Sequence, residues 1–360
     1  MKSWWIRTVD NAMSLELRDI PVPQPEAGQV GIRIRAAALN RGEFIAGHGL
    51  HTSSKARPAG FEAAGEVTSL GAGVTRWKLG DRVMGRCDGS FAEHGCMTAD
   101  EVFAAPARLT WEQAAASTVV FLTVYEALMA HGRLASGEWV LVTGISSGVG
   151  VAALQVAKAL GAKVIGTSGS LDKLERLKAM GLDVALHTRK PDFVPDVMQA
   201  TQNQGVDLVV NNVGGSVFPA CIEAMGFQAR LAMVGYVDGQ VEASIDLGAL
   251  HSKRLQLFGV SNKMRTMSHR IAAAQALERD LLPMLVDGRV TPLVDQVFSL
   301  DDLPAAQQIM QGNQHLGKLV VRHPFMAAPT LTIAVLTKNE AHRIEACLAS
   351  AEKVCDRSER

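Results

Sequence analysis

The stretch that most restricts the fold of this chain runs from residue 140 to residue 170 and reads VLVTGISSGVGVAALQVAKALGAKVIGTSGS. A short apolar strand leads into a Gly/Ser turn, an Ala-rich helical pattern follows, and a second apolar strand comes after Gly161. Parallel strands need a crossover of this kind, because a tight turn joins only antiparallel strands. Apolar strands go on alternating with helical patterns to about residue 262, which predicts an α/β fold with a doubly wound parallel sheet covered on both faces.

The Gly/Ser turn has the features of a phosphate-binding site. Glycines at 148 and 150 permit close approach of the backbone, and the start of the helix offers free N–H groups and a positive dipole end to an anion. Ile145 and Ser147 stand where the pattern G-x-G-x-x-G has its first two glycines, so an ordinary tight strand–helix turn is the alternative. The residues predicted to bind the pyrophosphate of a dinucleotide are Ser146, Ser147, Gly148, Val149 and Gly150.

The end of the second strand indicates which dinucleotide binds. An NAD site has an acidic residue about 20 residues after the glycines, which holds the ribose 2′-hydroxyl. Here the strand ends in Thr167 and Ser168, and no acid occurs before Asp172. These hydroxyl groups, with Lys173 and with Arg189 after the third strand, favour a 2′-phosphate. We therefore predict NADPH as the cofactor; an exposed lysine early in a helix is the alternative interpretation of Lys173.

The first 118 residues have a different pattern. Short alternating runs such as QVGIRIRAAAL and GEVTSLG are separated by Pro and Gly, which predicts a β-rich barrel or sandwich. After residue 265 an amphipathic helix is expected over IAAAQALERDLLPMLVDG, followed by strand, helix and strand up to residue 322. Because 360 residues exceed one comfortable hydrophobic core, two domains are expected.

Charge and cysteine content exclude several classes of function. Lys plus Arg and Asp plus Glu both number 36, so no overall field attracts nucleic acid or an anionic membrane. The five cysteines form no CxxC pair, which argues against a disulfide framework and a thiolate zinc knuckle. No apolar run approaches the roughly 20 residues of a membrane span, and the N-terminus lacks the apolar core of a signal peptide. A cytoplasmic protein is expected.

Four motifs, GDRVMG, GSFAEHG, LTVYEAL and SGEWVLVTGISSGVG, occur in this order after the β-rich start. With them the chain resembles the medium-chain dehydrogenase/reductase superfamily over residues 1–322, most closely its zinc-free quinone oxidoreductase branch. The resemblance implies a GroES-like β-rich catalytic domain formed by residues 1–118 and 263–322. It implies a Rossmann NADP(H)-binding domain over residues 119–262, and a homodimer joined at Rossmann sheet edges near LQLFGV.

The resemblance also bears on zinc. Zinc alcohol dehydrogenases of this superfamily have a ligand-bearing Gly-His-Glu stretch where this chain has Gly60-Phe61-Glu62, and a cysteine ligand where it has Asn40. A phenyl ring cannot bind zinc, and an amide oxygen is a poor ligand beside thiolate or imidazole. The four-cysteine structural lobe is missing too, since that region holds two cysteines. We predict that no metal is bound and that Glu62 is structural.

Two residues are predicted by the resemblance to act in catalysis. Asn40 stands where such quinone reductases carry an asparagine near the nicotinamide, and is expected to hydrogen-bond the cofactor or the substrate carbonyl; an asparagine in a turn is the alternative. His51 falls where relatives often have tyrosine and is a candidate general acid. An exposed loop histidine is the alternative for His51, and His48 is the other candidate.

Other residues are expected around the cofactor. Thr123, in LTVYEAL, is predicted near the nicotinamide, with a helix-capping role as the alternative. Strand ends in an open α/β sheet line the ligand crevice. On that basis the predicted set also includes Asn212, Gly235, Tyr236 and Phe258, and the resemblance adds Lys318. Phe258 as a plain core residue remains open.

The last segment falls outside this pattern. Residues 331–355, LTIAVLTKNEAHRIEACLASAEKVC, resemble the first strand and helix of a family-2 glycosyltransferase. The carboxylate motifs of that family come later in its sequence, so residues 323–360 are predicted to be a tail without activity.

These observations together predict a zinc-independent reductase. Without a Lewis acid to stabilise an alkoxide, hydride transfer is favoured toward an activated acceptor, which is a quinone or an α,β-unsaturated carbonyl. A second hypothesis is an enoyl-thioester reductase of the same fold, with Lys263, Arg265 and Arg270 near a CoA phosphate. A third is an NADPH-binding protein with little catalysis.

Overall fold

The computed structural model describes residues 1–10, 12–44 and 55–323. The described part up to His323 forms one compact unit built on three sheets. His51, His48 and the tail from residue 324 lie outside the described residues.

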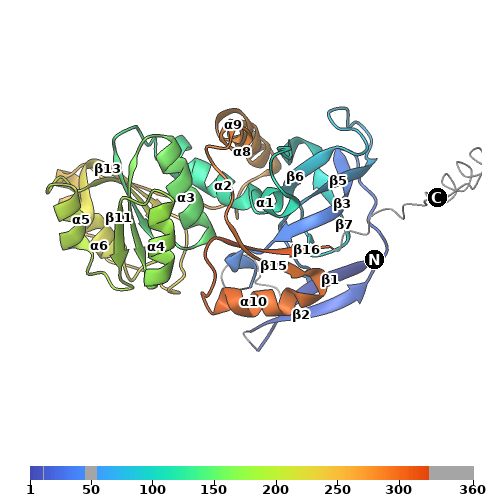
Figure 1. The fold of residues 1–360 in the computed structure, drawn as a ribbon, viewed down its shortest axis with the longest axis horizontal. Coiled ribbons are helices and arrows are strands. Elements are labelled where there is room, and N and C mark those ends of the chain that lie inside the picture. Colours follow the sequence, from blue (N-terminus) through green and yellow to red (C-terminus); the bar gives the residue numbers. More distant parts are fainter. Residues whose placement is uncertain (11, 45–54, 324–360) are drawn as a thin grey trace, which may run out of the picture. The chain divides into compact units, whose positions relative to one another are not determined.

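A seven-stranded, mostly antiparallel sheet occupies one half of this unit, with the strand order β15-β16-β3-β5-β6-β8 and β7 paired with β3 (Figure 1). Its strands are β3 (Gln29–Ala38), β5 (Glu62–Leu70), β6 (Arg82–Arg86), β7 (His94–Thr98), β8 (Val102–Ala104), β15 (Val294–Ser299) and β16 (Lys318–Arg322). β16 comes from the far end of the chain and pairs antiparallel with β3 through Val320↔Ala38 and Arg322↔Ala36. Both ends of the described chain therefore build this sheet, as the resemblance implies.

A small second sheet lies beside it, with the order β2-β1-β4. Its strands are β1 (Lys2–Val9), β2 (Ala12–Asp19) and β4 (Arg57–Pro58). Short helical elements follow several strands of this half, namely η1 (Arg41–Glu43), η2 (Ala99–Glu101) and α1 (Trp111–Ala115).

The third sheet has six parallel strands in the order β11-β10-β9-β12-β13-β14, which is the doubly wound arrangement expected from the sequence. Its strands are β9 (Trp139–Thr143), β10 (Lys163–Ser168), β11 (Val184–His187), β12 (Val206–Asn211), β13 (Met225–Met233) and β14 (Gln256–Gly259). Helices lie on both sides of it (Figure 1). These helices are α3 (Gly148–Ala159), α4 (Leu171–Ala179), α5 (Val194–Ala200), α6 (Phe218–Ala224) and α7 (Leu247–Ser252).

The apolar strands of this sheet explain the two helical layers. In β9, Val140 and Val142 belong to the core cluster that holds α3, whereas Leu141 belongs to the cluster that holds α5 and α6. Successive side chains of a strand point to opposite faces, so a strand that is apolar at every position needs cover on both.

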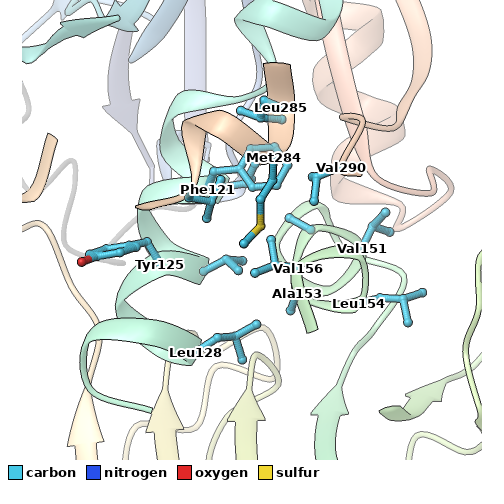
Figure 2. Packing of buried hydrophobic residues seen from close by; sticks show 14 of the residues in the cluster. Phe121, Tyr125, Leu128, Val151, Ala153, Leu154, Val156, Met284, Leu285 and Val290 are labelled. Carbon is cyan, nitrogen blue, oxygen red and sulfur yellow. The ribbon is translucent and has the colours of Figure 1, made fainter. Parts of the chain in front are cut away.

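Two further helical segments join the halves. α2 (Thr118–Val124) continues into a π-helical turn, η3 (Tyr125–Ala130). Figure 2 shows Phe121 of α2 beside Met284 and Leu285, which belong to α9 (Leu282–Asp287), and near Val151 of α3. This packing fixes α2 between the antiparallel sheet and the parallel sheet.

The amphipathic helix expected over IAAAQALERDLLPMLVDG is divided in two, and the expectation of one helix is corrected here. α8 (Met267–Asp280) ends before Leu281, and α9 begins at Leu282. Pro283 lies in the first turn of α9, where its missing N–H costs nothing; inside a longer helix it would remove a hydrogen bond and clash with the preceding turn. The remaining elements are η4 (Leu300–Asp302) and α10 (Leu303–Gln311).

Candidate functional site

The Gly/Ser turn between β9 and α3 forms a helix N-terminus that faces the neighbouring strand end. Ser147 caps the helix, and its Oγ accepts a hydrogen bond of 3.0 Å from the Gly150 N–H. A Cβ at residue 150 would lie 2.5 Å from the Ile145 carbonyl oxygen, so only glycine allows the helix to begin this close to the strand. The N–H groups of Gly148 and Val149 belong to the first turn, where no intrahelical acceptor is available.

The end of β10 lies against this turn. Ser168 Oγ is 3.3 Å from Ser146 Oγ, and both serines lie beside the helix start. Thr167 supports the turn itself, because its Oγ1 accepts from the Gly144 N–H at 3.2 Å and its carbonyl accepts from the Ile145 N–H. Ser146 and Ser168, two of the predicted serines, therefore lie together. The Thr167 hydroxyl is already hydrogen-bonded within the protein.

Arg189 reaches the same place from the segment after β11. A Cβ on Gly169 would run into the Arg189 side chain, so the guanidinium group lies over the backbone that follows Ser168. A cation at this position, next to a serine hydroxyl, is the arrangement that suits a phosphate.

Lys173 has a different set of partners from the one predicted. Its ammonium group donates to the carbonyl oxygens of Asn313 and His315, both at 2.7 Å. Burial lowers the pKa of Lys173, and the neighbouring Arg189, Arg176 and Arg41 lower it further. Lys173 thus ties α4 to the segment before β16 and adds positive charge beside Arg189.

Asn212, directly after β12, has an unpaired acceptor. Its Nδ2 donates to the Thr143 carbonyl at 3.0 Å, while its Oδ1 is buried with no partner among the described residues. The residue is only 4% exposed, and a buried polar atom without a partner is costly. We call Ser146, Ser147, Ser168 and Asn212 the sheet edge; they lie at the carboxyl ends of β9, β10 and β12.

The other predicted strand-end residues take different positions. Gly235 follows β13, and its N–H contacts the Asn211 carbonyl at 3.3 Å, so it lies next to Asn212; Tyr236 comes directly after it. The Phe258 ring packs on the core and on His131, with 5.5 Å between ring centroids. This is the arrangement of a partly buried core residue.

Asn40 and Lys318 meet in a buried group of charges. Lys318 Nζ donates to the Leu39 carbonyl at 2.8 Å, to Asn40 Oδ1 at 2.7 Å and to Glu62 Oε1 at 2.8 Å. Asn40 Nδ2 lies 3.1 Å from both Glu43 Oε1 and Glu62 Oε1. The other oxygen of Glu62 accepts from the Val119 N–H at 2.7 Å. We call Asn40, Glu43, Glu62 and Lys318 the charge cluster.

The charge cluster joins separate parts of the chain. It connects β3, β5, the start of α2 and β16, and the Lys318 stem packs against Gly148 at the start of α3. Gly317 also pairs with Ser147 as an isolated bridge. All three ammonium protons of Lys318 donate to oxygen atoms of the protein. Lys318 therefore supports the Gly/Ser turn through the aliphatic carbons of its side chain.

Glu43 is the cluster member that the sequence did not lead us to predict. It is 1% exposed, and burial raises its pKa to about 8. Its Oε1 accepts from the Asn40 N–H and Nδ2, both at 3.1 Å, which makes a capping box across η1. The pattern Asn-x-x-Glu at 40–43 is a helix-start pattern that could have predicted this contact.

The charge cluster does not fit a zinc ion. Phe61 offers no donor atom, and Glu62, the carboxylate beside it, is already paired with the Lys318 ammonium at 2.8 Å. A divalent cation at that carboxylate would stand next to a positive charge in a buried place, which is strongly unfavourable. Elsewhere in the described residues, no three His, Cys, Asp or Glu side chains are placed to share a metal ion.

The hydroxyl of Thr123 is also engaged in the protein. Thr123 Oγ1 donates to the Val119 carbonyl four residues earlier at 2.8 Å, and the residue is 9% exposed. A helix-internal bond of this kind leaves the oxygen able to accept another hydrogen bond.

A small cavity of about 30 Å³ lies between α2, α8 and the ends of β6 and η2. Phe61, just before β5, and Asn262, three residues after β14, both line it. Thr118 and Leu122 of α2 form another wall, and Thr118 was not among the predicted site residues. The cavity adjoins the carboxyl end of the parallel sheet, where ligands bind in folds of this kind.

Comparisons with known proteins identify two domains. Residues 26–108 match the family described as alcohol dehydrogenase GroES-like domain, and residues 148–277 match the family described as zinc-binding dehydrogenase. The structure of mycobacterial Rv1454c complexed with NADPH is 25% identical, with a TM-score of 0.80, and the alignment covers 89% of this chain and 100% of that one. No helix among the described residues is both long and apolar enough to cross a membrane.

Two further structures and one relative show the same likeness. A quinone oxidoreductase of Pseudomonas syringae is 27% identical, with a TM-score of 0.79 over 89% of this chain and 99% of that one. The CurK enoyl reductase is 26% identical, with a TM-score of 0.78 and the same coverage. A mycocerosic acid synthase-like polyketide synthase of Mycolicibacterium smegmatis is 30% identical over 89% of this chain, which spans only 15% of that protein's length.

The two family matches cover both halves of the structure, and the solved structures align with nearly all of its described part. The chain belongs to the medium-chain dehydrogenase/reductase superfamily and is an oxidoreductase with a GroES-like and a Rossmann-type half.

Proposed function

We propose that this protein is a zinc-independent reductase that uses NADPH to deliver hydride to a quinone or an α,β-unsaturated carbonyl. The observation that carries the proposal is the Lys318 ammonium group, which occupies the charge cluster and neutralises Glu62 at 2.8 Å. With a fixed organic cation where a zinc enzyme needs its metal, the site has no Lewis acid for alcohol oxidation. A conjugated acceptor needs only positioning and a polarised carbonyl.

The sheet edge supports NADPH as the cofactor. The first turn of α3 would bind the pyrophosphate, and Ser168 with Arg189 would bind the 2′-phosphate. The unpaired Asn212 Oδ1 would accept a hydrogen bond from the bound dinucleotide, which removes the cost of its burial. When bound, NADPH supplies the hydride. The structure of Rv1454c with NADPH, which aligns over 89% of this chain, adds support.

An acceptor panel tests the proposal. NADPH oxidation is measured at 340 nm with a 1,4-quinone, a short enone and an enoyl-CoA, and each assay is repeated with NADH and with a chelator present. We expect turnover of quinone or enone, a preference for NADPH, and no loss with the chelator. Stoichiometric zinc bound at Glu62, or activity lost on chelation, would overturn the zinc-independent assignment.

Two other functions are outcomes of the same panel. A clear preference for enoyl-CoA would identify an enoyl-thioester reductase, a function that the likeness to the CurK enoyl reductase supports. Tight NADPH binding without turnover of any acceptor would identify a binding protein with little catalysis.

We also propose a homodimer that forms through β14, the outermost strand of the parallel sheet. β14 is the last strand of that sheet, and Leu257 on it is 39% exposed. An apolar edge strand readily pairs with a second copy. Light scattering checks the mass in solution, and Leu257→Lys should shift it toward the monomer.

The free thiols of Cys87, Cys96 and Cys221 support the reducing cytoplasm as the location of the protein.

A further inference from the structure

The start of α2 carries two adjacent hydroxyl groups, and one of them is unused. Ser117 Oγ donates to the Gln113 carbonyl at 2.8 Å, and farther along the helix Thr123 Oγ1 donates to the Val119 carbonyl. Both follow the usual course of a hydroxyl in a helix, which is a bond to the carbonyl four residues earlier. Thr118 Oγ1 has no partner among the described residues, although Thr118 is only 2% exposed.

A buried hydroxyl without a partner is destabilising, because it has lost its hydrogen bonds to water. Thr118 lines the cavity between α2 and α8, with Phe61 and Leu122 as apolar neighbours. The next residue, Val119, is held by the bond from its N–H to Glu62 Oε2. The charge cluster therefore fixes the helix start, and with it the Thr118 side chain, at the wall of the cavity.

The charged groups around the cavity are balanced. Arg265 pairs with Glu126 at 2.9 Å, and Arg270 pairs with Glu101 at 2.9 Å. Arg86 lies over the Phe61 ring and pairs with Asp88 at 3.2 Å. Since each guanidinium group has a carboxylate partner, the cavity suits a neutral acceptor better than an anionic one.

We propose that Thr118 binds the acceptor: its hydroxyl donates a hydrogen bond to the carbonyl oxygen of a neutral conjugated ketone or quinone whose carbon skeleton packs between Phe61 and Leu122. This inference rests on the proposed function. In an enone, hydride adds to the β-carbon and the C=C electron pair moves toward the carbonyl oxygen. The Thr118 hydrogen bond stabilises the enolate oxygen that forms, and water then protonates the α-carbon and becomes hydroxide. Thr118 keeps its proton throughout.

The kinetic test compares Thr118→Val, which keeps the shape and removes the hydroxyl, with Thr118→Ser, which keeps the hydroxyl. Ser117→Ala is the matched control, because that hydroxyl is bonded within the helix. With 3-penten-2-one we expect Thr118→Val to lower kcat/KM about 10-fold to 100-fold. This is no larger than the loss of rate that follows removal of one hydrogen-bond donor to an oxyanion. Thr118→Ser and Ser117→Ala should stay within about threefold of the wild type. The Kd for NADPH should be unchanged in all three variants, and the melting temperature of Thr118→Val should not fall, because its hydroxyl has no partner to lose.

A binding measurement keeps the inference separate from the proposed function. The carbonyl stretch of bound 13C-labelled 2-pentanone, a saturated ketone, is recorded by difference infrared spectroscopy in wild type and Thr118→Val. We expect a lower frequency in the wild type and in Thr118→Ser. If no acceptor is turned over, the proposed function fails, and the infrared shift still decides the role of Thr118. An active wild type with unchanged Thr118→Val kinetics, or equal frequencies in all variants, would overturn the inference.

Discussion

The charge cluster and the sheet edge are both groups of polar side chains, each with one asparagine, and they differ in how completely their polar atoms are paired. In the charge cluster, every proton of the Lys318 ammonium and both oxygens of Glu62 have partners within the protein. At the sheet edge, Asn212 Oδ1 has none among the described residues, and the first turn of α3 has open N–H groups. Nearly all buried polar groups in proteins are paired, so an unpaired one indicates where a ligand binds.

The two regions therefore have different roles in the protein. Within the charge cluster, Glu43 Oε2 has no partner among the described residues, whereas Lys318 and Glu62 are fully paired. The paired charges stabilise the fold and position their neighbours, whereas the sheet edge has donors and acceptors left for a ligand. Variants of the charge cluster should therefore affect stability first, and variants of the sheet edge should affect cofactor binding first.

The largest effect is expected from Lys318→Met. Removal of the ammonium leaves Glu62, which is 0% exposed, as a buried carboxylate without its cation. Breaking a buried pair in this way costs about 3–5 kcal/mol of stability, measured by urea unfolding at pH 7. The double variant Lys318→Met/Glu62→Gln should recover much of that loss. A loss no greater than that of the exposed control Lys190→Met would show that the cluster is not structural.

Gly150→Ala should weaken NADPH binding next most strongly. The added Cβ would lie 2.5 Å from the Ile145 carbonyl oxygen and force the start of α3 away from the strand. Overpacking of this kind costs about 1–3 kcal/mol, which corresponds to about 10-fold to 100-fold in Kd if it acts on the binding turn. The control is Gly259→Ala, whose Cβ would meet nothing within 4 Å. Equal NADPH affinities in both variants, measured by fluorescence titration, would contradict a role for the turn.

Arg189 and Lys173, two cations beside the sheet edge, allow a finer test of cofactor preference. Arg189→Gln should reduce the preference for NADPH over NADH about 10-fold, the value of one charge-assisted hydrogen bond. Lys173→Gln should reduce it less, since the Lys173 ammonium is bonded to two carbonyl oxygens. Ratios of kcat/KM for the two cofactors measure both. A larger loss from Lys173→Gln would reverse the ranking of these two cations.

The titration of Glu43 tests the charge cluster gradually, over several pH units. Burial raises its pKa to about 8 from the ordinary value of 4.5, so the folded protein holds this proton more tightly than the unfolded chain. The stabilising contribution is full below pH 4.5, declines as pH rises, and is lost through pH 8, with a slope of at most about 1.4 kcal/mol per pH unit. Urea unfolding between pH 5 and 8 should show this decline relative to Glu43→Gln. Parallel curves would contradict it.

Part of this molecule could be predicted from its sequence because the relevant forces are local. The apolar strands and the Gly/Ser turn specify the parallel sheet, and Ser146, Gly148 and Gly150 come together because they are neighbours in the chain. The break between α8 and α9 was missed, although Pro283 was visible in the sequence. The helical periodicity continues on both sides of Pro283 and so predicts one helix, whereas the missing N–H of proline favours a break there.

The partners of Lys173 and Lys318, and the contact of Asn40 with Glu62, could not be predicted, because they come from distant parts of the chain. The Lys318 and Glu62 side chains are 256 positions apart, and Lys173 is bonded 140 and 142 positions away. Spacing in the sequence gives no information on such contacts. Thr118 is a similar case, since an unpaired hydroxyl is recognised only when every possible neighbour is known.

The sequence by itself determined the superfamily, the two kinds of half and the Gly/Ser turn, since each depends on short-range pattern and backbone geometry. The tertiary structure alone decided which polar side chains are satisfied by the protein and which are left for a ligand. Hydrogen-bond pairing depends on long-range packing. Among the described residues it separates Lys318 and Asn40, which hold the fold together, from Asn212 and Thr118, whose polar atoms remain unpaired.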